Sequence, residues 1–323
     1  MQSPIRLSQP TEMQKTTSAV HYENDVDFFQ AFLDPYMKYG SGYFAPGDGF
    51  EAASVRMLDR ALDEARLPLA SGRARILDVG SGWGSVRRRL VEREIPMEYH
   101  QINPSAVQRA FIDATFGPAA STHGGGLESA CLPDQYFDAI FMHDSFCHLD
   151  DKEAMLRKLA SALKPGGRLV LQDTFYATPD FRDKAVDAKT TRSIQEDLFG
   201  FAQIVPLETF TQQLTAAGLS LTVLEDVSVH YKRTVAAWLH RLASIDGARF
   251  PLKDACLRSL KRGAACMGYS TTHYFLVLNR QNSTLGGLKE TLYHLRTGMR
   301  TGSSEFPGQR VASAEPRSGQ VGV

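Results

Sequence analysis

Three glycines at alternate positions, Gly80, Gly82 and Gly84, follow a short apolar run that ends at Val79. The run predicts a buried strand, and the glycines allow the chain to turn sharply into a helix. A bare backbone at such a turn can pass directly beneath a bound ligand. The spacing differs from the dinucleotide-binding pattern, in which the third glycine would fall on Ser85. The alternative interpretation is a tight strand–helix turn without a ligand.

A second group of side chains could move protons. His143, Asp144 and His148 follow a predicted strand over residues 137–142, and α/β folds bind their ligands at the carboxyl ends of strands. His148, with an ordinary pKa of about 6.5, can take a proton from a hydroxyl or an ammonium group near neutral pH. Alternatively, its ring bonds the backbone at the start of a helix. Asp144 can accept a proton or cap the following helix, and we expect the cap.

Tyrosines precede the glycine turn at positions that could cover a ligand. They are Tyr22, Tyr36, Tyr39 and Tyr43. The face of an aromatic ring attracts a cationic acceptor or a sulfonium, so we expect a lid; a plain core role is the alternative. Asp173 and Glu196 either orient an acceptor or are ordinary surface acids.

Composition narrows the class of protein. Basic and acidic residues balance at 36 each among 323 residues, which gives no field favouring nucleic acid. The four cysteines show no metal-ligand spacing, so no metal is expected, and they suit a reduced compartment. No apolar stretch is long enough for a membrane span, and no signal core is present. We therefore expect a cytoplasmic protein, and the sequence is compatible with a homodimer.

Strands that alternate with helices predict an α/β fold. We expect a Rossmann-like, seven-stranded, mostly parallel sheet with helices on both faces, an N-terminal helical lid and an insertion after the fifth strand. The predicted organisation is a disordered arm over 1–20, a lid over 21–70, a core over 71–280 with a cap insertion near 176–206, and an extension over 281–323 that is disordered after about 300. A third strand within 121–126 is not resolved by the pattern.

The glycine turn after an Asp-ended strand resembles that of class I methyltransferases that use S-adenosylmethionine (SAM), and the similarity covers roughly residues 21–280. Within that superfamily the chain is similar to the cyclopropane fatty acid synthase group. The matching segments are His21-Tyr22-Glu23, Phe28-Phe29, Leu33-Asp34-Pro35, Tyr39–Phe44, Gln101–Gln108 and His230–Thr234 with Trp238. These segments fall in three regions of the chain, in the same order as in the family, which exceeds a coincidence of one glycine loop.

The resemblance implies SAM as cofactor and assigns residues to it. Gly80 and Gly82 would hold the methionine end, and Asp78 would order that loop. Asn103 stands where most class I enzymes place a ribose-binding acid, and an amide can still bond a hydroxyl. The remaining implied cofactor contacts are Tyr39, Gln108, Leu127, Glu128 and His143. The implied catalytic residues are His148, Asp144 and Tyr22.

The chain departs from the cyclopropane group at the residues that would carry out catalysis. Those synthases carry a Glu-His pair after the fourth strand, and the glutamate helps to hold a bicarbonate that takes the proton. Here the histidine is His148 and the glutamate is replaced by Cys147. The segment 144–152 instead resembles phosphoethanolamine- and sterol-type methyltransferases, in which a histidine works with an N-terminal tyrosine or an acid at the place of Asp144 receives the proton.

We therefore predict a SAM-dependent methyltransferase that acts on O, N or C of a small molecule, in secondary metabolism. The first alternative is C-methylation or cyclopropanation of an alkene in a lipid or isoprenoid. The second is a SAM-binding module without turnover. A nucleic-acid acceptor is disfavoured, because the chain has neither a basic excess nor the Asn/Asp-Pro-Pro-Tyr/Phe motif of such enzymes.

Overall fold

The computed structural model describes residues 26–178, 180 and 202–280. The predicted arm, Tyr22, Glu196, most of the expected insertion near 176–206 and the 281–323 extension lie outside the described residues. The described strands are β1 (Ala74–Val79), β2 (Met97–Ile102), β3 (Ser121–His123), β4 (Phe137–His143), β5 (Leu163–Tyr176), β6 (Leu219–Asp226) and β7 (Thr271–Arg280). The described helices of seven residues or more are α2 (Val26–Phe32), α3 (Phe50–Ala65), α4 (Ser85–Glu92), α5 (Ala106–Phe116), α6 (Lys152–Ala162), α9 (Leu207–Ala216), α10 (Ser228–Ala243) and α11 (Lys253–Cys266).

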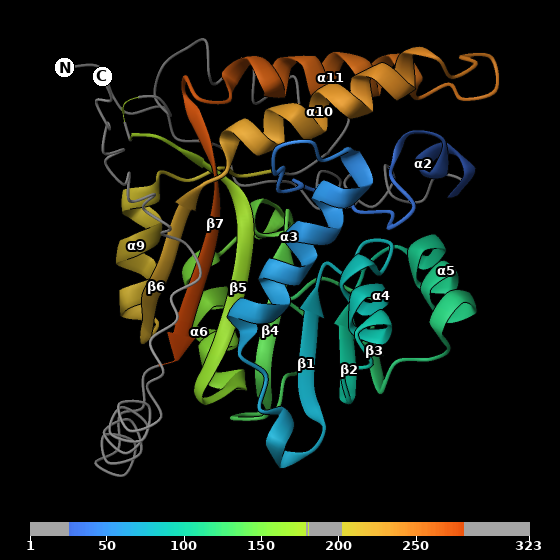
Figure 1. Cartoon of the computed structure of the whole chain (residues 1–323). Helices are drawn as coiled ribbons and strands as arrows, with labels where there is room; N and C mark the ends of the chain where they lie inside the picture. The colour runs from blue at the N-terminus through green and yellow to red at the C-terminus, as the bar shows by residue number, and fades with distance from the viewer. Residues whose placement is uncertain (1–25, 179, 181–201, 281–323) are drawn as a thin grey trace, which may run out of the picture. The chain divides into compact units, whose positions relative to one another are not determined.

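These strands form one seven-stranded sheet in the order β3-β2-β1-β4-β5-β7-β6 (Figure 1). The first five are parallel to their neighbours, and β7 runs antiparallel to both β5 and β6. Parallel neighbours require crossover connections, which helices supply here. The predicted fold class, a mostly parallel Rossmann-like sheet, is confirmed. The carboxyl ends of β1, β2, β4 and β5 consequently meet at one edge of the sheet.

Helices cover both faces of the sheet. Apolar side chains of α3 and α4, such as Leu58 and Leu90, pack on one face with Ile76 and Phe141. On the other face α6 and α9 bury their apolar sides against β4, β5 and β7. Because β1, β4 and the middle of β5 are buried on both faces, they are written as nearly continuous apolar runs. This is why their positions could be read from the sequence.

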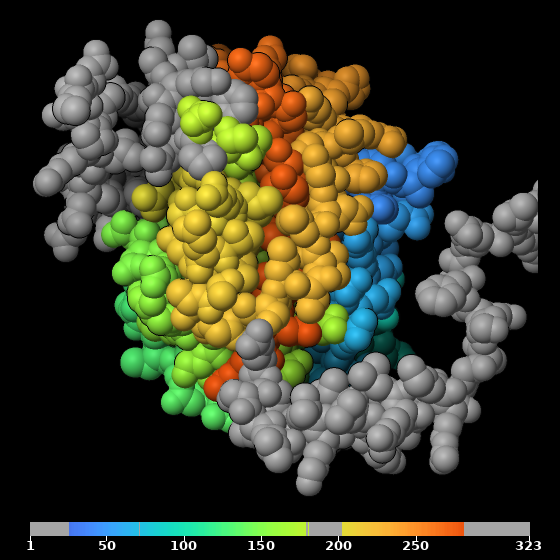
Figure 2. All heavy atoms as spheres, turned by 90° about the vertical axis from the view of Figure 1, so that its left-hand side faces the viewer, coloured from blue at the N-terminus to red at the C-terminus, as the bar shows by residue number. Residues whose placement is uncertain are grey.

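A third core lies above the carboxyl ends of the strands. It joins α2, α10 and α11 around Trp83 and Trp238, and Phe29 packs on Trp83 with ring centroids 5.0 Å apart. The sequence predicts a helix around 231–242, within α10, and none at α11. Along the chain, α10 and α11 both follow β6 and precede β7. Seen from the β6 edge, the yellow and orange residues of α9, β6 and α10 form much of the surface (Figure 2).

Two strands differ from the prediction. β3 has three residues, Ser121–His123, and pairs only with β2, so it carries little apolar signal. The sequence predicts β5 only over 168–172, with Pro165-Gly166-Gly167 ending the helix before it, whereas in the structure these three residues lie inside β5. The register of β4 against β5 shifts between Phe137 and Ala139, and this irregularity accommodates the turn-forming residues.

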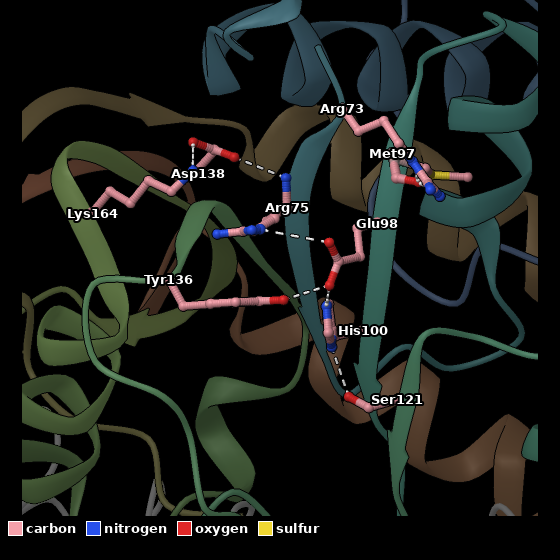
Figure 3. Close-up of polar contacts among 9 residues, drawn as sticks. All are labelled: Arg73, Arg75, Met97, Glu98, His100, Ser121, Tyr136, Asp138 and Lys164. Atoms are coloured by element: carbon pink, nitrogen blue, oxygen red, sulfur yellow. Dashed lines mark hydrogen bonds and ion pairs between the residues drawn. The ribbon is translucent and has the colours of Figure 1, made fainter. Parts of the chain in front are cut away.

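A polar network joins the strands near their amino ends (Figure 3). Glu98 of β2 pairs with Arg75 of β1 at 3.5 Å and with His100 at 3.1 Å, and Tyr136 donates to the same carboxylate. Asp138 accepts from Lys164 Nζ at 2.5 Å. The charged and polar groups of this network supply one another's hydrogen-bond and ion-pair partners. The network therefore has a structural role at the edge of the sheet opposite the glycine turn.

Candidate active site

The glycine turn opens the site at the end of β1. Gly80, Gly82 and Gly84 have φ of +73°, +53° and +80°, a region that favours glycine. A Cβ on Gly80 would lie 2.5 Å from Ser145 Cβ, and one on Gly84 would lie 3.0 Å from Ile112 Cγ1. At Gly82 the nearest atom is 4.0 Å away, the carbonyl oxygen of Gly80. Gly82 is therefore the glycine whose missing side chain leaves open space.

This open space belongs to a chamber of about 1400 Å³. Among the residues assigned to the cofactor by resemblance, its lining includes Tyr39, Gly80, Gly82, Asn103, Gln108, Glu128 and His143. The structure thus brings together residues from β1, β2, β4 and the segment before α3. A bare backbone wall, an amide, a carboxylate and an aromatic face are groups that fit the amino acid, ribose, adenine and sulfonium of SAM. We call this space the cofactor chamber.

Asp78 and Leu127 do not line the cofactor chamber. Asp78 is buried and accepts a hydrogen bond from Tyr99 Oη at 2.7 Å, so it joins β1 to β2 instead of bonding the glycine loop. Burial raises the pKa of Asp78 to about 7, and the bond from Tyr99 opposes that rise. Leu127 is part of the apolar core against β4 and α6.

The Asn103 amide supports the glycine loop. Its Nδ2 donates to Ser81 Oγ at 3.1 Å and to the Gly82 carbonyl at 3.0 Å, and its Oδ1 accepts from Ser105 N at 3.0 Å. Both amide protons are thus committed within the protein, and only the carbonyl oxygen keeps a lone pair for a hydroxyl. The structure assigns Asn103 a loop-holding role that the sequence did not reveal.

A second chamber of about 1060 Å³ lies beneath α10 and α11. Its walls are mainly apolar and aromatic and include Tyr231, Val235, Trp238, Leu260 and Met267. Ligand pockets with walls of this character hold small molecules. We call this space the acceptor chamber. Tyr39, Asp144 and His148 line both chambers, so the two spaces meet at these three side chains.

Asp144 does not cap a helix, and that expectation is wrong. The N-cap of α6 is Asp151, whose carboxylate accepts from Ala154 N at 2.9 Å. Asp144 directly follows β4 and has a φ of +53°, and among the described residues its Oδ2 has no hydrogen-bond partner. Burial raises the pKa of Asp144 to about 8, and the nearby Lys38 ammonium opposes the rise. A carboxyl group with this pKa is a stronger base than an exposed one.

His148 and Asp173 also face the acceptor chamber. His148 ends the short 3-10 turn η2 (Phe146–His148), and its backbone N donates to the Ser145 carbonyl at 3.2 Å. Asp173 is not a surface acid: it is buried and accepts from the backbone N of Cys147 and of Thr174. Burial raises the pKa of Asp173, and these two bonds oppose the rise.

Of the tyrosines expected to form a lid, only Tyr39 lines the chambers among those that the structure describes. Its ring lies 5.1 Å from that of Trp238. Tyr36 Oη donates to Glu92 at 2.6 Å, and Tyr43 Oη donates to Glu225 at 3.1 Å, away from the chambers. Tyr22 lies outside the described residues.

Buried polar groups next to the site were missed by sequence reasoning. Lys38 and His273 are 2% and 0% exposed, and both lie beside Asp144. His143 is also buried, and in the described part of the chain neither of its ring nitrogens has a hydrogen-bond partner. Burial and the Lys38 charge lower the pKa of His143 well below its ordinary value, so the ring is neutral. A polar residue inside an apolar strand was the available signal for His273.

No His, Cys, Asp and Glu side chains of the described ranges come together in a group that could hold a metal ion. Across the same ranges, no helix is long and apolar enough to cross a membrane.

Comparison with known proteins places the chain in a family. The model of the mycolic acid cyclopropane synthetase family matches residues 9–254. The chain is 26% identical over 236 residues to cyclopropane mycolic acid synthase MmaA2 of Mycobacterium tuberculosis, which covers 69% of this chain and 80% of that protein. It is 29% identical over 203 residues to 27-O-demethylrifamycin SV methyltransferase of Amycolatopsis mediterranei, covering 62% and 71%.

Solved structures agree on the fold. The cyclopropane synthase MmaA2 from Mycobacterium tuberculosis superposes with a TM-score of 0.72 at 23% identity, covering 84% of this chain and 99% of that one. Coclaurine N-methyltransferase gives 0.69 at 17% identity, covering 84% of each chain. Because the family model matches most of the 323 residues, the chain belongs to the mycolic acid cyclopropane synthetase family and is a SAM-dependent methyltransferase.

Proposed function

We propose that this methyltransferase methylates a largely apolar small molecule held in the acceptor chamber, and that Asp144 takes the proton released by the methylated centre. The observation that carries this proposal is the junction of the two chambers at Tyr39, Asp144 and His148. An acceptor atom at that junction lies next to both a methyl donor site and a buried carboxylate. The relatives act on different acceptors by name, so the chamber and not the name indicates the acceptor class.

The residues at the junction supply positioning and a base. When bound, SAM supplies a methyl group carried on a positively charged sulfur. The Tyr39 ring, which borders both chambers, offers a π face to positive charge. The apolar walls around Trp238 exclude water and hold the acceptor in line, which lowers the entropic part of the barrier. Asp144 Oδ2, with a free lone pair, then accepts the proton.

Cys147 does not serve as this base. It occupies the place of the glutamate in the Glu-His pair of cyclopropane synthases. Burial and the neighbouring Asp173 raise the pKa of the Cys147 thiol well above its ordinary value, so the thiol stays protonated. The carboxylate at the junction comes instead from Asp144, at the end of β4.

A second candidate is methylation of a hydroxyl or amine with His148 as base. The observation in its favour is that His148 lines both chambers as Asp144 does. The two candidates predict opposite orders for the loss of turnover in the His148 and Asp144 variants. If His148 is the base, His148→Ala lowers turnover by ~10²–10⁴-fold and Asp144→Asn costs less; if the centre is an alkene carbon, the ranking inverts.

An untargeted screen with methyl-labelled SAM tests the proposal. Apolar and polar fractions of a cell extract are incubated with the enzyme, and products that gain the label are sought by mass spectrometry. We expect labelled product from the apolar fraction. Labelled product only from the polar fraction would contradict the acceptor class, and no labelled product with intact SAM binding would favour a binding module.

The homodimer and the cytoplasmic location expected from the sequence remain predictions. Sedimentation velocity of the purified chain tests the homodimer, and fractionation of the source cells tests the cytoplasmic location.

A further inference from the structure

We infer that Lys38 and His273 are positioning residues that hold the Asp144 carboxylate between them at the junction of the chambers. Neither residue is part of the lining of either chamber, so both act through Asp144. This inference rests on the proposed role of Asp144. It assigns a chemical task to two buried residues from opposite ends of the chain.

The turn before Lys38 directs its side chain inward. Asp34 Oδ1 accepts from Tyr36 N at 2.7 Å, and Met37 N donates to the Asp34 carbonyl at 2.8 Å. Met37 then takes a φ of +53°, which is uncommon for this residue type and reverses the chain direction. Lys38 Nζ consequently reaches Gln172 Oε1 of β5 at 3.2 Å.

Gly40 shows how closely Lys38 and Asp144 approach. A Cβ built on Gly40 would lie 2.2 Å from Asp144 Oδ2 and 2.8 Å from Lys38 Nζ. The ammonium and the carboxylate therefore lie around the same small space, from which a side chain is absent. Burial lowers the pKa of Lys38, and the Asp144 and Asp34 carboxylates oppose this fall, Asp144 more strongly than Asp34.

His273 approaches Asp144 from β7. Its Nε2 lies 3.6 Å from Asp144 Oδ1, slightly longer than a hydrogen bond and within reach of a small carboxylate rotation. Its Nδ1 lies 2.9 Å from Thr174 Oγ1, and its ring stacks on Tyr231 at 4.2 Å. Burial and the Lys38 charge lower the pKa of His273 to about 3, so the ring is neutral. In the tautomer in which the Thr174 hydroxyl donates to Nδ1, the ring proton lies on Nε2, the nitrogen nearer to Asp144.

Among the groups around Asp144, Lys38 is the one whose positive charge lowers the pKa of the Asp144 carboxyl. Asp173 from β5 raises the pKa of Asp144, the Ser41 backbone N–H donates to the carboxylate and lowers it, and Cys147 from η2 is neutral. His143, next in the chain, is also neutral. Lys38 supplies the positive charge that opposes this rise, so removing the charge should raise the pKa of Asp144 further.

The test is the titration of Asp144 itself, which needs neither acceptor nor turnover. Protein labelled with [4-¹³C]aspartate is titrated by NMR, and Asp144→Asn identifies the resonance. Lys38→Met should raise the Asp144 midpoint by at least ~1 pH unit, as expected for one unit charge lost nearby. His273→Phe keeps the stacking ring, removes the donor and should raise the midpoint by less.

A matched control is Lys164→Met, which removes a lysine from the network at the opposite edge of the sheet (Figure 3). It should change the resonance of Asp138 and leave that of Asp144 unchanged. Lys38→Gln, which can keep a bond to Gln172 without the charge, repeats the test if Lys38→Met does not fold. An Asp144 midpoint that stays within about 0.3 pH units of the wild type in the folded Lys38 variant, roughly a third of the smallest expected shift, overturns the inference.

This readout separates the inference from the proposed function. A shifted midpoint with full turnover in Asp144→Asn would support the positioning and refute Asp144 as base. An unshifted midpoint with turnover lost in Asp144→Asn would support the base and refute the role of Lys38.

Discussion

Gly40→Ala places a methyl group where the Asp144 carboxylate now lies. The new Cβ would be 2.2 Å from Oδ2, and real Cβ contacts keep at least 3.0 Å, so the carboxylate must retreat by about 0.8 Å. The backbone itself accepts alanine, because φ at Gly40 is not positive. A displacement of ~1 Å at a reacting group can cost on the order of 10²-fold in rate. We therefore expect kcat to fall by roughly 30- to 100-fold, about 2–2.7 kcal/mol in the barrier.

The assay is kcat at saturating SAM with the acceptor found by the labelled screen, beside the affinity for SAM measured by calorimetry. The affinity should change less than about threefold, because Gly40 does not line the cofactor chamber. Gly49→Ala is the matched control: Gly49 precedes α3 with extended backbone, and a Cβ there meets nothing within 4 Å. A kcat for Gly40→Ala within about threefold of the control would refute the reasoning.

Further predictions address the two chambers and the base. Gly82→Val should abolish SAM binding while thermal unfolding stays cooperative, since a side chain there enters open space at a positive φ; unchanged affinity in calorimetry would contradict this. Turnover should rise with pH through about 8 and then level off, because Asp144 accepts a proton only when ionised and its pKa is raised to about 8; a flat profile between pH 6 and 9, about two units around that value, would count against Asp144. Residues 26–44 should exchange amide hydrogens more slowly with SAM bound, and identical exchange would return Tyr39 to a plain core role. Gly263→Phe should raise KM for the acceptor and leave SAM affinity unchanged, because Gly263 lines the acceptor chamber with open space beside it; an unchanged KM would place the acceptor elsewhere.

The parts of the site that depend on local sequence were predictable. The glycine turn and the ends of β1, β2 and β4 are encoded by contiguous residues, so Gly82 and His143 could be assigned to one ligand space. The contacts of Asp144 could not be predicted. Lys38 and His273 lie more than a hundred residues from Asp144 in sequence, and no periodicity links the three.

Two features were predicted wrongly or missed, the cap of α6 and the helix α11, and each has a physical reason. Asp144 and Asp151 both precede α6, and the sequence alone does not tell which acid caps it; the 3-10 turn over Phe146–His148 separates Asp144 from the helix. The helix α11 was missed although it closes the acceptor chamber. Its apolar side, including Cys256 and Leu260, packs on α2 and α10, so its role depends on tertiary contacts.

The central claim is methyl transfer from SAM to an apolar acceptor with Asp144 as the base. Its most direct measurement is a matched pair of reactions at pH 8 with methyl-labelled SAM, one with the wild type and one with Asp144→Asn, in which labelled product and S-adenosylhomocysteine are both quantified. We expect equal amounts of the two products from the wild type, and product formation lower by ~10²–10⁴-fold in Asp144→Asn with SAM bound equally well. Equal product from both proteins would contradict the assignment of the base, and S-adenosylhomocysteine without labelled product would contradict methyl transfer to the acceptor.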